Sequence, residues 1–179
     1  MKRLITFISI ILTLQANCNG QNFFNLTDSV FELGQINRFE IIYQMSGGHR
    51  PTIESLPVLD SIVDFLKKNK NLIIEVGVHT DNCCDSTMNY QLSEWRARSV
   101  TDYFIEKGIE IDRLQYKGYG ECNPIIVDSI INIKYPFLAI GQKLDEDYIK
   151  KLDTIEKQEV ANRLNRRTEI KIVEINQGP

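Results

Sequence analysis

Residues 72–81 have the sequence LIIEVGVHTD, the pattern of a buried strand that ends in a polar turn. Successive side chains of a strand point to opposite faces, so alternate residues of this stretch share one face. Four apolar side chains lie on that face: Leu72, Ile74, Val76 and Val78. Asp81 follows directly after the strand, where open α/β sheets usually place their ligands. The stretch therefore predicts a central strand with a candidate binding residue at its end.

Amphipathic helices are predicted on both sides of this strand. Upstream, apolar residues from Leu56 to Leu66 recur at helical spacing, with Ser55 as a cap and Pro57 in the first turn. Downstream, a second helix is predicted to begin near Met88 and to end at Lys107-Gly108. The apolar stripe of each helix must pack against a sheet.

Three further strands complete the predicted sheet. Alternation predicts a first strand over residues 39–44, a third over residues 114–120 and a last one over residues 168–172. Residues 125–164 form a less regular, partly helical insert, in which Asp145 is a candidate cap and Asp153 with Glu156 has a capping-box pattern. The order of elements predicts an α+β fold, an α/β sandwich: a βαβαββ mixed sheet covered by helices on one face, with the insert before the last strand.

The first 20 residues have the three parts of a secretory signal peptide. Lys2 and Arg3 precede an apolar run that is too short to span a bilayer, and a short polar stretch follows it. Cys18 lies where bacterial lipoproteins are cut and lipidated, so lipidation there and plain cleavage near Gly20 are both open. The predicted organisation is a signal peptide at 1–20, a short extension at 21–35, one domain at 36–175 and a tail at 176–179.

The charge of the chain argues against some partners. The formal charge of the 179 residues is −3, and without the first 20 residues it becomes −5, with 19 Lys and Arg against 24 Asp and Glu. Nucleic acids and anionic membranes bind basic surfaces. No nucleic-acid partner and no cofactor are expected.

A series of short motifs follows in a fixed order along the chain. It comprises His79-Thr80-Asp81-Asn82, Asn89, Leu92-Ser93, Arg96-Ala97, Gly108-Ile109, Arg113-Leu114, Gly118-Tyr119-Gly120-Glu121, Asn123-Pro124-Ile125 and Asn165-Arg166-Arg167-Thr168-Glu169. The series resembles the OmpA-like C-terminal domain family, which includes peptidoglycan-associated lipoproteins and flagellar stator B subunits. The resemblance implies noncovalent binding of peptidoglycan through the diaminopimelate of its stem peptide. It also implies a periplasmic protein of the outer-membrane envelope that is not an enzyme.

The resemblance places an acid and a guanidinium at the centre of the site. Asp81 and Arg96 would contact the ammonium and the carboxylate at the end of the diaminopimelate side chain. Arginine can hold a carboxylate with two parallel hydrogen bonds, which lysine cannot reproduce. The implied neighbours are Thr80, Asn82, Asn89, Leu92 and Arg166. An internal salt bridge between Asp81 and Arg96 is the structural alternative. Val78, Cys84 and Tyr43-Gln44 depart from the usual family pattern around this site.

The cysteines predict a disulfide more readily than a metal site. The parallel strands 72–79 and 114–120 leave the sheet at the same edge, so Cys122 is predicted to pair with Cys83 or Cys84. His49, His79 and Asp81 could join these cysteines around a metal, but adjacent cysteines lack the usual ligand spacing, and no metal is expected.

Two other functions remain open at this stage. A cell-wall hydrolase would need a nucleophile, a metal or an acid pair, and only the weak cysteine and histidine set offers one. Alternatively, the domain is an interaction module for other envelope proteins that lost peptidoglycan binding and uses the 125–164 insert as its partner surface. Tyr90 and Trp95 could serve as sugar platforms, although a partly buried packing role is the favoured interpretation of both.

Overall fold

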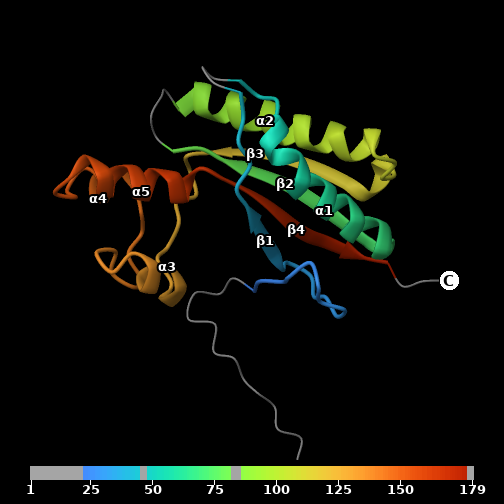
Figure 1. Cartoon of the computed structure of the whole chain (residues 1–179), viewed down its shortest axis with the longest axis horizontal. Helices are drawn as coiled ribbons and strands as arrows, with labels where there is room; N and C mark the ends of the chain where they lie inside the picture. The colour runs from blue at the N-terminus through green and yellow to red at the C-terminus, as the bar shows by residue number, and fades with distance from the viewer. Residues whose placement is uncertain (1–21, 45–47, 82–85, 177–179) are drawn as a thin grey trace, which may run out of the picture.

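The strands form one mixed sheet in the order β1-β4-β2-β3 (Figure 1). The computed structural model describes residues 22–44, 48–81 and 86–176. The strands are β1 (Ile36–Phe39), β2 (Leu72–His79), β3 (Leu114–Gly120) and β4 (Arg167–Ile175). β4 is antiparallel to both of its neighbours, β1 and β2, while β2 and β3 are parallel. The last strand in the sequence therefore lies inside the sheet.

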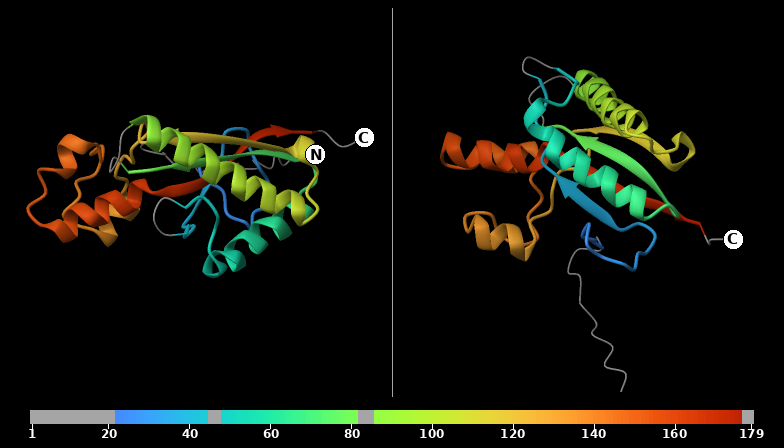
Figure 2. Two further views of the ribbon diagram at one scale, coloured as in Figure 1. Left: turned by 90° about the horizontal axis from the view of Figure 1, so that it is seen from above. Right: turned by 45° about the vertical axis from the view of Figure 1, so that its right-hand side comes forward.

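Helices α1 (Leu56–Lys68) and α2 (Ser86–Glu106) run along the sheet and share one hydrophobic core with it (Figure 2). The core takes the alternate residues of β2 that the sequence predicts, and it takes Ile170 and Ile172 from β4. Leu59 and Leu66 of α1 and Phe104 of α2 pack against them and are fully buried. The predicted mixed sheet with helices over one face is confirmed.

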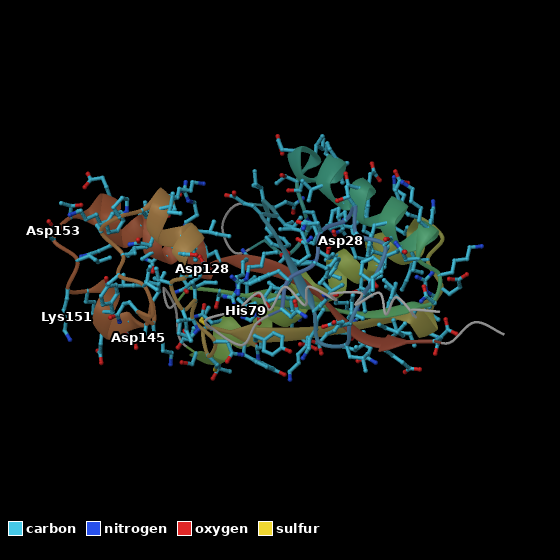
Figure 3. The ribbon with its side chains drawn as sticks, turned by 90° about the horizontal axis from the view of Figure 1, so that it is seen from below. Asp28, His79, Asp128, Asp145, Lys151 and Asp153 are labelled. Carbon is cyan, nitrogen blue, oxygen red and sulfur yellow. The ribbon has the colours of Figure 1, made fainter. Side chains whose placement is uncertain are left out.

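Residues between β3 and β4 form a separate lobe at one end of the sheet (Figure 2). It contains α3 (Ser129–Lys134), α4 (Glu146–Ile149) and α5 (Ile155–Asn165). The lobe has a small core of its own, built from Ile125, Val127, Leu138, Leu144, Ile149 and Ala161. Asp128 and Asp145 cap α3 and α4 with their side chains (Figure 3). The predicted cap at Asp145 and the helical character of the insert are confirmed.

The structure corrects three local predictions. β1 spans Ile36–Phe39 instead of residues 39–44, because only those four residues pair with β4, and Tyr43 makes just an isolated bridge to Pro51. Thr154, one residue after the predicted Asp153, caps α5 by accepting a hydrogen bond from the Lys157 amide. The second helix begins at Ser86, ahead of Met88.

Ser55 precedes α1 as predicted but does not cap it with its side chain. Its hydroxyl accepts a hydrogen bond of 2.7 Å from the Ile42 amide instead. The neighbour of Ile42, Ile41, is buried in the core. The serine therefore joins the segment after β1 to the start of α1.

Residues 22–35 pack onto the domain. Phe24 stacks on Phe65 of α1, and Phe31 meets the same ring edge-on. Phe23 forms an isolated β-bridge with Ile36, the first residue of β1. In the part of the chain that the structure describes, no helix is both long enough and apolar enough to cross a membrane. The predicted signal peptide and Cys18 lie outside the described residues.

Candidate peptidoglycan-binding site

The candidate site lies where β2 ends, and strand register determines its composition. His79, the last residue of β2, pairs with Arg167, the first residue of β4. Thr80 and Asp81 follow His79, and Arg166 directly precedes Arg167, so the side chains of Asp81 and Arg166 meet at the end of these two antiparallel strands. On the other side, the Thr80 amide donates a 2.9 Å hydrogen bond to the Gly120 carbonyl at the end of β3.

Asp81 is 5% exposed and forms an ion pair with Arg166. The contact joins Arg166 Nη1 to Asp81 Oδ2, and Arg166 Nη2 contacts Glu159 of α5. One guanidinium thus lies between two carboxylates, one at the end of the sheet and one on the insert. No hydrogen bond to Asp81 Oδ1 is found among the described residues. The Thr80 hydroxyl beside it is buried and also has no hydrogen-bond partner in that part of the chain.

Arg96 lies on α2 and is held by the segment that follows β1. Its Nε donates a 3.2 Å hydrogen bond to the Gly48 carbonyl, and its guanidinium carbon lies 4.5 Å from the centre of the Tyr43 ring. The Tyr43 hydroxyl is 2.9 Å from Thr168 Oγ1, and Thr168 pairs with Val78 of β2. Burial raises the pKa of Tyr43 to about 12, so its hydroxyl stays protonated at neutral pH. This chain of contacts connects Arg96 to the end of β2 that carries Asp81.

The ion pairs of the described residues join Asp81 to Arg166, not to Arg96. The predicted internal salt bridge between Asp81 and Arg96 is therefore not present in this structure. Sequence reasoning grouped all three residues but did not identify Arg166 as the partner of Asp81. It also missed Gly48, Tyr43 and Glu159, because their contacts depend on how distant segments pack.

The start of α2 is fastened to the end of β3. The Asn89 amide group and the Ser86 hydroxyl both donate hydrogen bonds to the carboxylate of Glu121. One turn later, the Ser93 hydroxyl accepts a 2.9 Å hydrogen bond from the Gly120 amide. Asn89 is thus buried as a structural contact of α2, whereas Leu92 is only half-buried on the same helix.

Gly118 explains how closely α2 approaches β3. A β-carbon at this position would lie 2.4 Å from the Glu94 amide nitrogen, which is closer than any real contact of this kind. The Gly118 amide donates a 2.7 Å hydrogen bond to the Glu94 carboxylate. Gly118, in the Gly118-Tyr119-Gly120 motif, therefore allows the short distance between α2 and β3, and this distance affects where Arg96 lies.

Several predicted residues have other surroundings or lie outside the described residues. Asn82, Cys83 and Cys84 are not among the described residues, and Cys122 is an exposed free thiol. The predicted disulfide remains a prediction. Within the described residues, no group of three or more His, Cys, Asp or Glu side chains could hold a metal ion. Trp95 and Tyr90 are 54% and 52% exposed, so about half of each side chain is accessible.

The arrangement suits a ligand group that carries both charges. A carboxylate and a guanidinium on adjoining elements can contact an ammonium and a carboxylate of one molecule, and hydrogen bonds between charged groups are stronger than neutral ones. The exposed ring of Trp95, which lies 6.4 Å from that of His49, adds an aromatic surface on the same helix as Arg96.

The segment that carries most of the candidate site is similar to an OmpA-like domain. Residues 52–132 match the OmpA family, and this segment contains both Asp81 and Arg96. Outer membrane protein A of Escherichia fergusonii is 43% identical over 80 residues, which are 45% of this chain and 32% of that protein. Outer membrane protein P5 of Haemophilus influenzae is 37% identical over 67 residues, 37% of this chain and 19% of that protein. The matches thus cover a third or less of these two relatives.

A solved structure supports the fold beyond the matched segment. The periplasmic domain of Helicobacter pylori MotB superposes with a TM-score of 0.55 at 18% identity, and the match covers 81% of this chain and 79% of that one. At this level of identity the likeness concerns the fold. It covers a larger share of the chain than the segment that matches the OmpA family.

Proposed function

We propose that this protein binds peptidoglycan without covalent chemistry, through the charged side-chain end of a stem-peptide diaminopimelate, and so links the cell envelope to the cell wall. The observation that carries the proposal is the pair of adjacent polar groups at the end of β2. Asp81 Oδ1 and the buried Thr80 hydroxyl have no hydrogen-bond partner among the described residues. The Thr80 hydroxyl is buried, and an unpaired buried polar group costs free energy, so a ligand that pairs with it would be stabilised.

The ligand chemistry follows from the charges at the site. A diaminopimelate side chain ends in an ammonium and a carboxylate. Asp81 would accept from the ammonium through Oδ1 while Arg166 keeps its contact with Oδ2. Arg96, already oriented by Gly48 and Tyr43, would receive the carboxylate. Each group of the ligand therefore has a partner of opposite charge, and no bond of the ligand needs to be broken.

The decisive experiment is co-sedimentation of the purified protein with insoluble peptidoglycan of two kinds. Diaminopimelate-containing wall should pull the protein down. Wall with lysine at the third stem position lacks the terminal carboxylate and should bind at least ~10-fold more weakly, because Arg96 loses its charged partner. Equal binding to both walls would rule out recognition of diaminopimelate. A protein that binds neither wall would contradict the proposed function as a whole.

The location that this function requires is also a proposal. The protein would be exported and retained in the envelope, with the outer membrane as its second attachment if Cys18 is lipidated. Fractionation followed by mass spectrometry distinguishes the two forms: acyl chains on Cys18, or a new N-terminus near residue 20. Protein that stays in the cytosol with Met1 intact would contradict export.

One observation favours a second candidate function, an interaction module for other envelope proteins. The insert exposes Ile130, Ile133 and Ile140, and the first two lie on the single short helix α3. Exposed apolar side chains in a cluster are typical of protein interaction surfaces. This function becomes the better one if the folded protein ignores peptidoglycan and captures an envelope protein through these isoleucines.

A further inference from the structure

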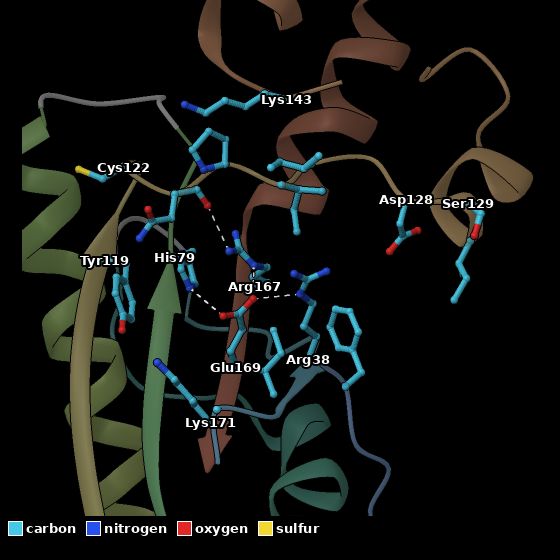
Figure 4. Close-up of a pocket in the computed structure, with 18 of the residues that line it drawn as sticks. Arg38, His79, Tyr119, Cys122, Asp128, Ser129, Lys143, Arg167, Glu169 and Lys171 are labelled. Atoms are coloured by element: carbon cyan, nitrogen blue, oxygen red, sulfur yellow. Dashed lines mark hydrogen bonds and ion pairs between the residues drawn. The ribbon is translucent and has the colours of Figure 1, made fainter. Parts of the chain in front are cut away.

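The helix-free side of the sheet carries a cavity of about 800 Å³ that the candidate peptidoglycan site does not use (Figure 4). It lies between the strands and the first part of the insert. Four of its charged lining residues come from the strands, namely Arg38, Arg167, Glu169 and Lys171, and the insert adds Lys143 and Asp128.

Buried charged groups form the floor of this cavity. Glu169 accepts hydrogen bonds of 2.9 Å from Arg38 Nε and 2.7 Å from Arg167 Nε, and its other oxygen lies 3.3 Å from His79 Nε2. His79 stacks on Tyr119 with ring centres 4.8 Å apart and nearly parallel planes. Two guanidinium groups thus share one carboxylate, and the floor retains a positive charge.

The two lysines of the cavity extend this positive charge. Lys143 and Lys171 stand at opposite ends of the pocket (Figure 4), and neither forms an ion pair with any described residue. Asp128, the second lining acid, already accepts a hydrogen bond from the Ile131 amide as the cap of α3. The lining therefore has four Lys and Arg against two acids, a formal charge of +2 on a chain whose total is −3.

The positive lining continues past α3 into a second cavity of about 430 Å³, which shares Arg38, Arg167 and Ile130 with the first. This part adds Lys134, Arg163 and Arg166 to the basic residues and Glu40 to the acids. The two cavities together form a basic groove with a formal charge of +4. An acidic protein that gathers basic residues in one concave surface provides a complementary field for an acidic partner.

The groove is also apolar and long. Ile126, Ile130 and Ile140 line it with exposed side chains, and Ile130 and Ile140 are 75% and 60% exposed. Arg167, Glu169 and Lys171 lie on the same face of β4, so the strand carries lining charges over about 13 Å, or roughly four residues of extended chain. A small inorganic anion would use neither the length nor the isoleucines.

We propose that this basic groove binds an extended acidic peptide segment of another protein, with carboxylates near Lys143 and Lys171 and aliphatic side chains against the exposed isoleucines. The groove shares Arg166 with the site that contains Asp81 and Arg96, but Lys143 and Lys171 line only the groove. The inference does not rest on peptidoglycan binding, and the two can fail separately.

The test uses the full mature chain and a fluorescent peptide of sequence Asp-Ile-Glu-Ile-Asp, followed by anisotropy. The doubly substituted protein Lys143→Glu/Lys171→Glu should bind this peptide at least ~10-fold more weakly than the wild type, because both ends of the groove would then repel it. The control Lys68→Glu/Lys151→Glu has the same net charge, and its residues lie at the end of α1 and in the outer part of the insert, with Lys151 far from His79 (Figure 3). The control should bind within about twofold of the wild type, since it changes only the remote field.

Three further measurements make the result decisive. The neutral peptide Asn-Ile-Gln-Ile-Asn and a peptide with glycine in place of isoleucine should both bind more weakly than the acidic one. Inorganic phosphate should not compete at equal concentration. Loss of binding in both double variants, or full competition by phosphate, would overturn the proposal, as would the absence of peptide binding to the wild type. Retained sedimentation of Lys143→Glu/Lys171→Glu with peptidoglycan would separate the two sites.

Discussion

At the residue scale, Asp81 of the candidate site already forms an ion pair in the absence of a ligand. Asp81 contacts Arg166, which also contacts Glu159. A ligand ammonium at Asp81 would therefore join an existing ion pair. Two acids and one guanidinium leave a net negative charge around this pair, which favours an added cation. Arg96 lies on α2, on the helix side of the same strand end, and its positive charge favours the ligand carboxylate.

The first prediction concerns this acid and this guanidinium. Asp81→Ala and Arg96→Ala should each weaken peptidoglycan binding by ~2 to 5 kcal/mol, a thirtyfold loss or more, because each leaves a ligand charge without its partner. Arg96→Lys should recover only part of the affinity, since an ammonium cannot make the planar two-pronged contact.

Arg98→Ala serves as the matched control, because Arg98 lies on the same helix but is exposed and contacts only Asp102 among the described ion pairs. It should sediment like the wild type. Circular dichroism establishes that every variant is folded. Folded Asp81→Ala and Arg96→Ala proteins that still sediment fully would show that the site lies elsewhere.

A second prediction follows from His79 on the other face of β2. Burial lowers the pKa of His79 from its usual 6.5, although the nearby Glu169 opposes this shift. The unfolded chain then binds more protons than the folded one, so stability is full above about pH 6.5 and falls as the pH drops below it. Glu169 acts later: burial alone would raise its pKa, but His79 and Arg167 outweigh burial and hold the pKa well below 4.5. Its contribution is lost only under more acidic conditions.

Urea unfolding at pH 7 and pH 5 tests this assignment. His79→Gln removes the titrating group, so the stability of this variant should change less between the two pH values than that of the wild type. His49→Gln is the control, because His49 is the only other histidine and is exposed. Its pH dependence should equal that of the wild type. An unchanged slope in His79→Gln would show that another group controls stability in this range.

At the scale of elements, the buried side chain of Asn165 holds parts of the insert together just before β4. Asn165, the last residue of α5, accepts a 2.9 Å hydrogen bond from the Ile125 amide and donates one of 2.8 Å to the Leu144 carbonyl. It thereby ties the beginning of the insert and its middle to the helix that leads into β4. The residue belongs to the Asn165-Arg166-Arg167 motif, so one motif contributes both to the insert and to the candidate site.

The third prediction is that Asn165→Ala destabilises the protein by ~1 to 3 kcal/mol, because it leaves a buried amide and a buried carbonyl unpaired. Asn162→Ala is the matched control on the same helix. The Asn162 side-chain oxygen is buried and has no partner among the described residues, so its removal breaks no recorded hydrogen bond. Urea midpoints of the two variants provide the comparison. Equal midpoints would mean that Asn165 does not support the insert.

The sequence predicts the elements whose patterns are long and regular. β2, β3, α1 and α2 follow from alternation or helical spacing, since each buries one full face. The first strand was misplaced because Ile41 and Tyr43 continue the alternation of β1 after the pairing with β4 has ended. These side chains are held by packing and by the contact between Ile42 and Ser55, which no periodic pattern reveals. The cap at Thr154 was missed by one residue, because two neighbouring side chains could both serve.

The sequence predicts which residues belong to the candidate site, but it does not predict which of them form an ion pair. Motif order brings Asp81, Arg96 and Arg166 into one list, but only the register of β2 with β4 determines that Asp81 meets Arg166. The basic groove was not predictable at all. Arg163, Arg166 and Arg167 are close in the sequence, but the other basic lining residues come from distant segments, so no single stretch reveals the groove.

At the scale of the whole molecule, charge separates into two surfaces. The proposed peptidoglycan site combines Arg96 of α2 with the shared acid Asp81, while the proposed basic groove occupies the helix-free side of the sheet beside the insert. If both proposals hold, the protein can contact the wall and a protein partner at once. Binding of the acidic peptide to protein already sedimented with peptidoglycan measures this directly.

The position of β4 has a consequence for how the chain is made. A polypeptide leaves the ribosome, and crosses a membrane pore, with its N-terminus first. β1 and β2 are joined in the sheet only through β4, residues 167–175, so the four-stranded sheet cannot be complete while this C-terminal segment is still being synthesised. A chain truncated after residue 166 should therefore lack cooperative unfolding and be rapidly cleaved by protease. A truncated chain as resistant as the full one would disprove this. If the chain is exported as proposed, this order keeps the four-stranded sheet incomplete until the last strand has emerged.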